Sequence, residues 1–102
     1  MARSRCEFRD GRLIASGDLS TDVDTSFDGA CQQLLAERSK EPVADLSAVS
    51  YLSSTYVGLL AELALNLGQS GRKLTVVAGP KVSALLREAG LGAVAILEES
   101  KR

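Results

Sequence analysis

The sequence predicts a single α/β domain over residues 1–102, with a mixed sheet of four to five strands, an N-terminal β-hairpin and about three to four helices. Short apolar runs alternate with runs of helical spacing, which is the order that parallel βαβ units produce. An Asp-Gly pair separates the first two apolar runs and is a strong hairpin signal. No internal repeat or linker-like stretch divides the chain, and 102 residues are enough for one hydrophobic core.

The first third of the chain predicts a hairpin followed by a helix. Residues 5–9 alternate between charged and apolar side chains, and residues 12–16 resume an apolar pattern after Asp10-Gly11. A type I′ turn needs positive φ at both central positions, which Asp-Gly tolerates. Residues 17–22 are expected to form a polar loop, and residues 24–37 an amphipathic helix. Its apolar positions are Phe27, Ala30, Cys31, Leu34 and Leu35.

The middle third predicts a strand, a polar turn and a second helix. Pro42 favours an extended entry into a short strand at residues 43–46, and Asp45 is expected near its end. The helix after the turn should end at Gly68 or Gly71. Its apolar stripe consists of Tyr56, Leu59, Leu60, Leu63, Ala64 and Leu67, and Leu60 and Leu63 are expected to pack on the sheet.

The last third predicts a strand, a helix and a final strand. Residues 73–78 are rich in β-branched side chains, which favours a strand. Gly79-Pro80 turns the chain into a helix whose apolar positions are Val82, Leu85, Leu86 and Ala89. Gly90 is expected to cap this helix, with Leu91 in the accompanying hydrophobic contact. Residues 93–97 are predicted to be a short strand, and residues 98–102 a charged tail.

Composition excludes several classes of function. The net charge of −1 and the lack of a basic stripe argue against nucleic-acid binding. The chain has no histidine, and Cys6 and Cys31 are too few for a disulfide framework or a zinc site, so neither a metal nor a cofactor is expected. No apolar run approaches the roughly 20 residues of a membrane span, and no signal core follows the N-terminus. We therefore expect a cytoplasmic protein without membrane insertion.

Three consecutive hydroxyl residues, Ser53, Ser54 and Thr55, lie where the second helix should begin. The first N–H groups of a helix lack internal partners, so this turn is suited to accept or oppose negative charge. The hydroxyl groups also fit a plainer role as helix N-caps. Asp18, Asp22 and Asp24 of the preceding loop fit either a solvated capping loop or the acidic rim of a docking face.

The stretch from Asp45 to Leu60, DLSAVSYLSSTYVGLL, resembles the signature of STAS domains, the family of anti-sigma factor antagonists. In that signature a strand ends Asp-Leu-Ser, and a short turn leads to Asp-Ser-Ser-Gly-hydrophobic-Gly at the start of a helix. Gly17-Asp18-Leu19 resembles the end of the family's second strand. Residues 71–77 resemble its next strand and residues 82–91 its last helix, so the resemblance covers nearly the whole chain in order.

The resemblance places the family's phosphorylated serine at Ser54. Ser53 stands where the family has Asp, and Thr55 stands where it has a second serine. Tyr56 replaces the family's first glycine, whereas Gly58 keeps the second. Tyr56 fits either the first core residue of the apolar stripe or an exposed aromatic anchor. The partner-binding face implied by the resemblance consists of Asp18, Asp22, Ser53, Ser54, Thr55 and Tyr56.

The resemblance implies a regulatory protein-interaction module and not an enzyme. Such a domain docks on a serine-kinase anti-sigma factor or a related switch protein, and phosphorylation of its serine abolishes docking; a PP2C-type phosphatase is a further partner. The alternative is a constitutive STAS scaffold or accessory subunit, in a stressosome-like assembly or a lipid-transport ABC system, without phosphorylation switching. A phosphocarrier enzyme fits poorly, because Cys6 falls within its strand and no anion-binding loop follows it.

Overall fold

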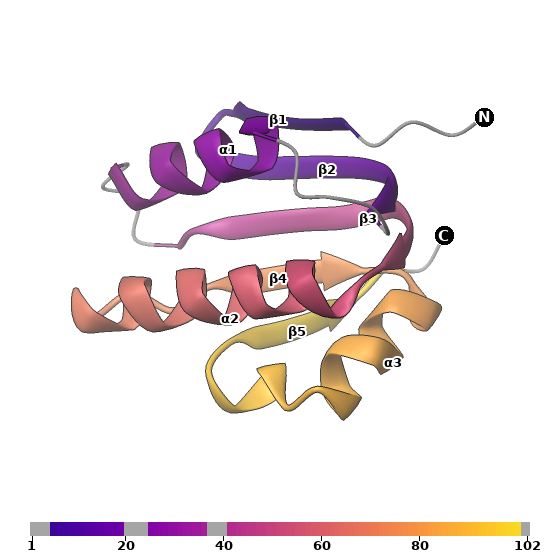
Figure 1. The fold of residues 1–102 in the computed structure, drawn as a ribbon. Coiled ribbons are helices and arrows are strands. Elements are labelled where there is room, and N and C mark those ends of the chain that lie inside the picture. Colours follow the sequence, from indigo (N-terminus) through magenta and orange to yellow (C-terminus); the bar gives the residue numbers. More distant parts are fainter. Residues whose placement is uncertain (1–4, 20–24, 37–40, 101–102) are drawn as a thin grey trace.

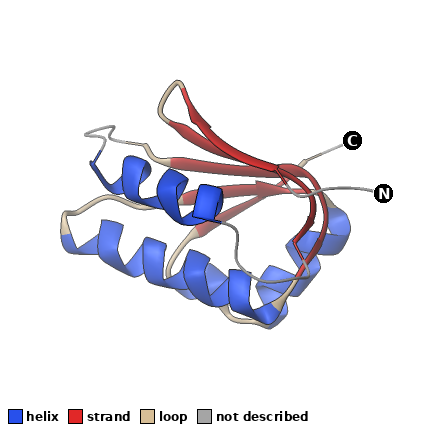
Figure 2. Cartoon of the chain, turned by 45° about the horizontal axis from the view of Figure 1, so that its top comes forward, coloured by secondary structure: helices blue, strands red, loops and turns tan. Residues whose placement is uncertain are grey.

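Three α-helices lie against one face of a five-stranded sheet in the described part of the chain (Figures 1 and 2). The computed structural model describes residues 5–19, 25–36 and 41–100. In chain order these residues form β1 (Arg5–Arg9), β2 (Arg12–Leu19), α1 (Thr25–Ala36), β3 (Val43–Leu52), α2 (Ser54–Gln69), β4 (Thr75–Ala78), α3 (Pro80–Glu88), the 3-10 turn η1 (Leu91–Ala93) and β5 (Ile96–Glu99). This order confirms the predicted α/β class.

The strands follow one another across the sheet in the order β1-β2-β3-β4-β5. β1 pairs with β2 antiparallel, and the remaining neighbours pair in parallel. The predicted hairpin is confirmed, because Asp10 and Gly11 join its strands with φ values of 52° and 74°. Since β2 to β5 run in the same direction, their carboxyl ends gather at one edge of the sheet.

The hydrophobic core lies between the sheet and the helices. Leu13 on β2, Leu46 on β3 and Val76 on β4 are buried on the face that the helices cover. The predicted stripe of α2 packs on them, with Leu60 0% exposed and Leu63 2% exposed. Its other buried members are Tyr56, Ala64 and Leu67, whereas Leu59, which was expected in the stripe, is only half-buried.

β3 is a ten-residue strand, so the prediction of a short strand followed by a polar turn is wrong. Its register with β2 shifts twice: Ile14 pairs with Asp45 but Ser16 with Ala48, and Gly17 pairs with Val49 but Asp18 with Tyr51. Each shift inserts an extra residue into β3, which is a β-bulge and disturbs the alternation of buried and exposed side chains. Figure 2 shows the strands curving toward the helices at this end.

Asp45 was expected near the end of its strand but lies near the start of β3. It is the third residue of β3, and its carboxylate accepts hydrogen bonds from the backbone N–H of Ser47 at 3.0 Å and from the Ser47 hydroxyl at 2.6 Å. Asp45 therefore stabilises the strand locally.

Other boundaries also differ from those expected. β2 continues through Gly17 to Leu19, where a polar loop was predicted. β5 is Ile96–Glu99 and not residues 93–97, because Gly90 adopts φ of 83° and the chain makes a 3-10 turn before entering the strand. Ala89, predicted to be apolar core, is exposed. Residues 24 and 37, the predicted ends of the first helix, lie outside the described residues.

Candidate functional site

The predicted hydroxyl turn forms the corner at which β3 passes into α2 (Figure 1). β3 ends at Leu52, Ser53 is the N-cap, and Ser54 is the first helical residue. The backbone N–H of Ser53 donates to the carbonyl oxygen of Leu19 at 2.9 Å, which ties this corner to the carboxyl end of β2. We call the residues Asp18, Leu19, Tyr51, Ser53, Ser54 and Thr55 the α2 corner.

The start of α2 is exposed and has no side-chain cap. Ser53 has extended backbone angles, but its hydroxyl makes no capping hydrogen bond, and Ser54 and Thr55 are exposed to solvent. The interpretation of these hydroxyl groups as side-chain N-caps therefore fails for Ser53. Because helix geometry leaves the first N–H groups without internal partners, this end of α2 favours negative charge.

Two buried oxygen atoms at the α2 corner have no hydrogen-bond partner. They are Oδ1 of Asp18 and Oγ of Ser53. Asp18 pairs with Tyr51 in the β2–β3 register, and no described lysine or arginine forms an ion pair with its carboxylate. Most buried polar atoms in proteins are hydrogen-bonded, so two buried oxygen atoms without a partner at one corner are unusual.

Tyr56 is a core residue, which corrects the interpretation of it as an exposed aromatic anchor. Its side chain is 1% exposed, and its ring packs edge-to-face on Phe27 with the centroids 4.9 Å apart. At the third helical position the ring points under α2 toward α1, because the helix turns this position to the inside. The exposed tyrosine of the corner is Tyr51, at 48%, which the sequence interpretation did not select.

The structure therefore brings together Asp18, Ser53, Ser54 and Thr55 of the predicted docking face. Asp22 lies outside the described residues. The structure also has a shallow groove that the sequence does not predict. It lies between the middle of β3 and the start of α3 and is lined by Ser47, Val49, Ser50, Gly79, Pro80, Lys81 and Val82. The sequence signal for it was Gly79-Pro80, which follows β4 at the edge where parallel strands end.

The described residues contain no group of three or more Cys, Asp or Glu side chains placed to hold a metal ion. Within the same part of the chain, no helix is long and apolar enough to cross a membrane.

Comparisons with known proteins agree on one family. A family model described as "Mlab, STAS domain" matches residues 3–98. Among solved structures, the chain is similar to the crystal structure of an anti-sigma factor antagonist from Mycobacterium paratuberculosis, with 26% sequence identity and a TM-score of 0.75. That match covers 99% of this chain and 88% of the other. A comparison with curated proteins found no match.

Proposed function

Because the chain belongs to the STAS domain family, we propose that it is a cytoplasmic protein-interaction module whose docking is controlled by phosphorylation of Ser54. The observation that carries the proposal is the position of Ser54, which is exposed and is the first residue of an uncapped helix. Its hydroxyl is accessible to a kinase, and the helix beneath it favours added negative charge. The protein partner is a serine-kinase anti-sigma factor or a related switch protein, and a PP2C-type phosphatase would reverse the modification.

The switch follows from simple electrostatics. A phosphate on Ser54 adds about 1.5 to 2 negative charges at neutral pH. At the start of α2 the domain accepts this charge without loss of stability, since the helix dipole is favourable there. In an interface the same charge is removed from water without a matching cation, which is costly, and the partner dissociates.

Asp18 supports a partner that brings a hydrogen-bond donor or a cation to the α2 corner. Its buried Oδ1 has no donor, and it lies on the strand that Ser53 contacts. Asp18 as a residue is half-buried, and a cationic side chain of the partner would form a charge-assisted hydrogen bond with the part of its carboxylate that solvent reaches. Thr55 and the backbone around Ser53 complete the proposed contact surface.

A second candidate function is constitutive docking, as a STAS scaffold or accessory subunit in a stressosome-like assembly or a lipid-transport ABC system. Ser53 favours it, because an uncharged residue stands where the phosphorylated members of the family have Asp. In this function Ser54 is exposed but never modified.

Site mapping by mass spectrometry tests the switch and separates the two candidates. The purified chain is incubated with ATP and a lysate of its native cells, and phosphate is located on wild type and on Ser54→Ala. We expect phosphate on Ser54 in wild type and none at this corner in the variant. Ser53 and Thr55 serve as internal controls. Phosphate on Thr55 alone, or no phosphate on a chain that still captures its partner, contradicts the proposal and favours constitutive docking.

A further inference from the structure

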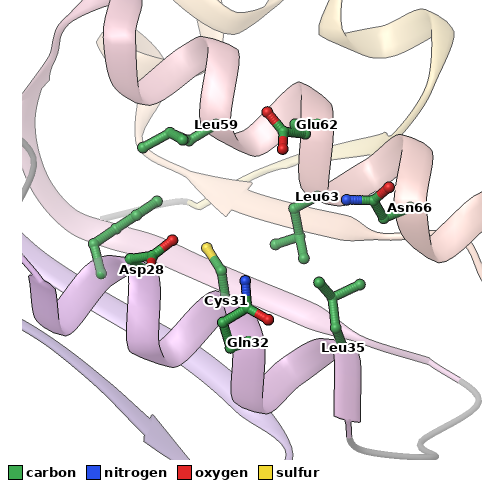
Figure 3. A pocket seen from close by; sticks show the side chains of 9 residues that line it. Asp28, Cys31, Gln32, Leu35, Leu59, Glu62, Leu63 and Asn66 are labelled. Carbon is green, nitrogen blue, oxygen red and sulfur yellow. The ribbon is translucent and has the colours of Figure 1, made fainter.

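A second surface lies farther along α2, in the groove between α1 and α2 (Figure 3). Figure 3 shows Asp28, Cys31 and Gln32 of α1 facing side chains of α2. We call this the α1–α2 groove, and its full lining is Phe27, Asp28, Cys31, Gln32, Leu35, Leu59, Glu62, Leu63 and Asn66. It contains a cavity of about 40 Å³.

The rim of the groove is polar on both helices. α1 contributes Asp28 and Gln32, and α2 contributes Glu62 and Asn66, all four exposed. Residues four apart lie on the same face of a helix, so each helix presents one carboxylate and one amide along the groove. Every one of these side chains has an oxygen that accepts hydrogen bonds.

The floor of the groove is apolar and remains partly open. Phe27 and Leu63 belong to the core, whereas Leu35 and Leu59 are half-buried at the groove itself. Leu59 borders the open groove, so it is less buried than the other members of the predicted apolar stripe of α2. A ligand entering from solvent therefore passes between the rim carboxylates and meets hydrocarbon at the floor.

Cys31 lies at the centre of this groove and is directed into it. Its side chain is 8% exposed, its thiol is free, and the described residues give it no hydrogen-bond partner. Burial, followed by the negative charges of Cys6, Asp28 and Glu62, raises the pKa of the Cys31 thiol from 9.0 to about 12. The thiol thus stays protonated and is a weak donor in a site of negative potential.

No described cation neutralises the two carboxylates. The ion pair between Arg9 and Glu7 involves neither Asp28 nor Glu62. Arg72 approaches the end of α1, where its Nη2 donates to the carbonyl oxygen of Leu35 at 3.0 Å and its Nε donates to the Ser70 hydroxyl. It is not among the residues that line the groove.

We propose that the α1–α2 groove receives the side chain of an arginine from a partner protein. The guanidinium of the arginine lies between Asp28 and Glu62, and its methylene groups pack on Leu59, which lies beside Asp28 at the same end of the groove. Long cationic side chains bury their hydrocarbon stem and keep their charged end at a polar rim. The planar guanidinium presents five donors, enough for carboxylates on two sides, which the single ammonium of lysine matches less well.

The size of the cavity supports a single side chain as the occupant. Pockets for cofactors and drug-sized ligands measure roughly 300–1,000 Å³, far more than this cavity provides. Arginine is one of the residues that most often anchor a protein interface by filling a single small pocket. The proposal rests on the proposed docking role only in requiring a protein partner, and it does not depend on modification of Ser54.

Titration of the 15N-labelled full chain by NMR tests the proposal with three matched peptides. The probes are acetyl-Ala-Ala-X-Ala-Ala-amide with arginine, lysine or citrulline as X; citrulline keeps the shape of arginine but lacks its charge. We expect saturable amide shifts centred on residues 28–35 and 59–66 with the arginine peptide. The lysine peptide should bind more weakly, and the citrulline peptide should produce no saturable shifts there.

A pair of charge-matched variants shows whether the rim carboxylates are responsible. Asp28→Asn/Glu62→Gln should weaken the arginine peptide roughly tenfold. Glu88→Gln/Glu98→Gln removes the same charge from exposed positions on α3 and β5 and should leave binding within about twofold. The proposal is overturned if the citrulline peptide binds as tightly as the arginine peptide, or if both double variants lose the same affinity. It is also overturned if the amide shifts lie outside the groove or if the arginine peptide does not bind. Since no peptide contacts Ser54, failure here is distinct from failure of the phosphorylation switch.

Discussion

Ser53 and Asp18 each bury one oxygen atom without a hydrogen-bond partner. Leaving a buried polar group unsatisfied costs about 1–3 kcal/mol, so these oxygen atoms do not stabilise the isolated domain. The sequence placed both residues on the docking face through the family signature, but residue type alone could not reveal that the Ser53 hydroxyl fails to cap α2.

Ser53→Ala should therefore lower the free energy of unfolding by less than about 0.5 kcal/mol, or raise it slightly. If the Ser53 hydroxyl capped the helix, its removal would lower the free energy of unfolding by about 1 kcal/mol. Urea unfolding measures the difference. Ser47→Ala is the control, since it removes a hydroxyl that donates to Asp45 at 2.6 Å, and it should cost about 1 kcal/mol. A loss above about 1 kcal/mol for Ser53→Ala would show that its hydroxyl is satisfied in solution.

Cys31 makes stability depend on alkaline pH. Its pKa is raised from 9.0 to about 12 in the folded chain, so above pH 9 the unfolded chain loses a proton that the folded chain retains. The stabilising contribution of the protonated thiol is complete below pH 9 and decreases as the pH rises toward 12. The difference in unfolding free energy between wild type and Cys31→Ala should shrink between pH 9 and 11. A difference that stays constant over this range contradicts the assigned burial of the thiol.

Among the elements, β3 departs most from its sequence-based prediction, whereas the helices were predicted well. Buried positions run Ala44, Leu46, Val49 and Leu52, so the spacing changes from two residues to three at the bulges. A period-two pattern cannot reveal a strand in which extra residues interrupt the alternation. The apolar stripe of α2 has no such interruption, and its helical period placed Leu60 and Leu63 correctly.

Gly17 on β2 lies at the second register shift between β2 and β3. Its φ of 87° lies in the left-handed region, and it precedes the second register shift. Gly17→Ala should lower the free energy of unfolding by about 1–2 kcal/mol, because a Cβ is strained at this φ. Gly29→Ala is the matched control on α1, where a Cβ meets nothing within 4 Å, and it should be neutral or stabilising by up to about 1 kcal/mol. If Gly17→Ala and Gly29→Ala change the free energy of unfolding equally in chemical denaturation, the positive φ of Gly17 at the register shift is contradicted.

Leu60 tests the packing of α2 on the sheet. Leu60→Ala should cost about 2–5 kcal/mol, since the side chain is 0% exposed and its removal leaves a cavity. Leu65→Ala lies on the same helix at 56% exposure and should change the free energy of unfolding by less than about 0.5 kcal/mol. If both variants lose similar unfolding free energy in urea, α2 does not pack on the sheet through the face that carries Leu60.

For the whole molecule, the order of patterns along the chain sufficed to predict the α/β class, the hairpin and the family, and the structure and the comparisons confirm all three. The α2 corner was predictable in part, since Ser53, Ser54 and Thr55 are consecutive in sequence. The sequence could not predict the exposure of Tyr51, the groove that Lys81 lines or the α1–α2 groove, because these features depend on how separate elements pack. The proposed docking surface therefore depends on the assembled sheet edge, and the proposal places Ser54 at its centre.

Calorimetric titration of the purified partner with wild type, Ser54→Asp and Gln69→Glu shows whether charge at Ser54 controls docking. Ser54→Asp adds a charge where the α2 dipole favours it, so the free energy of unfolding should be unchanged or higher by about 0.3–1 kcal/mol. Its affinity for the partner should nevertheless fall roughly tenfold or more. Gln69→Glu adds the same charge at the other end of the same helix and should bind like wild type. Folded Ser54→Asp that binds as tightly as wild type would contradict the switch and leave Ser54 as a bystander on a constitutive docking surface.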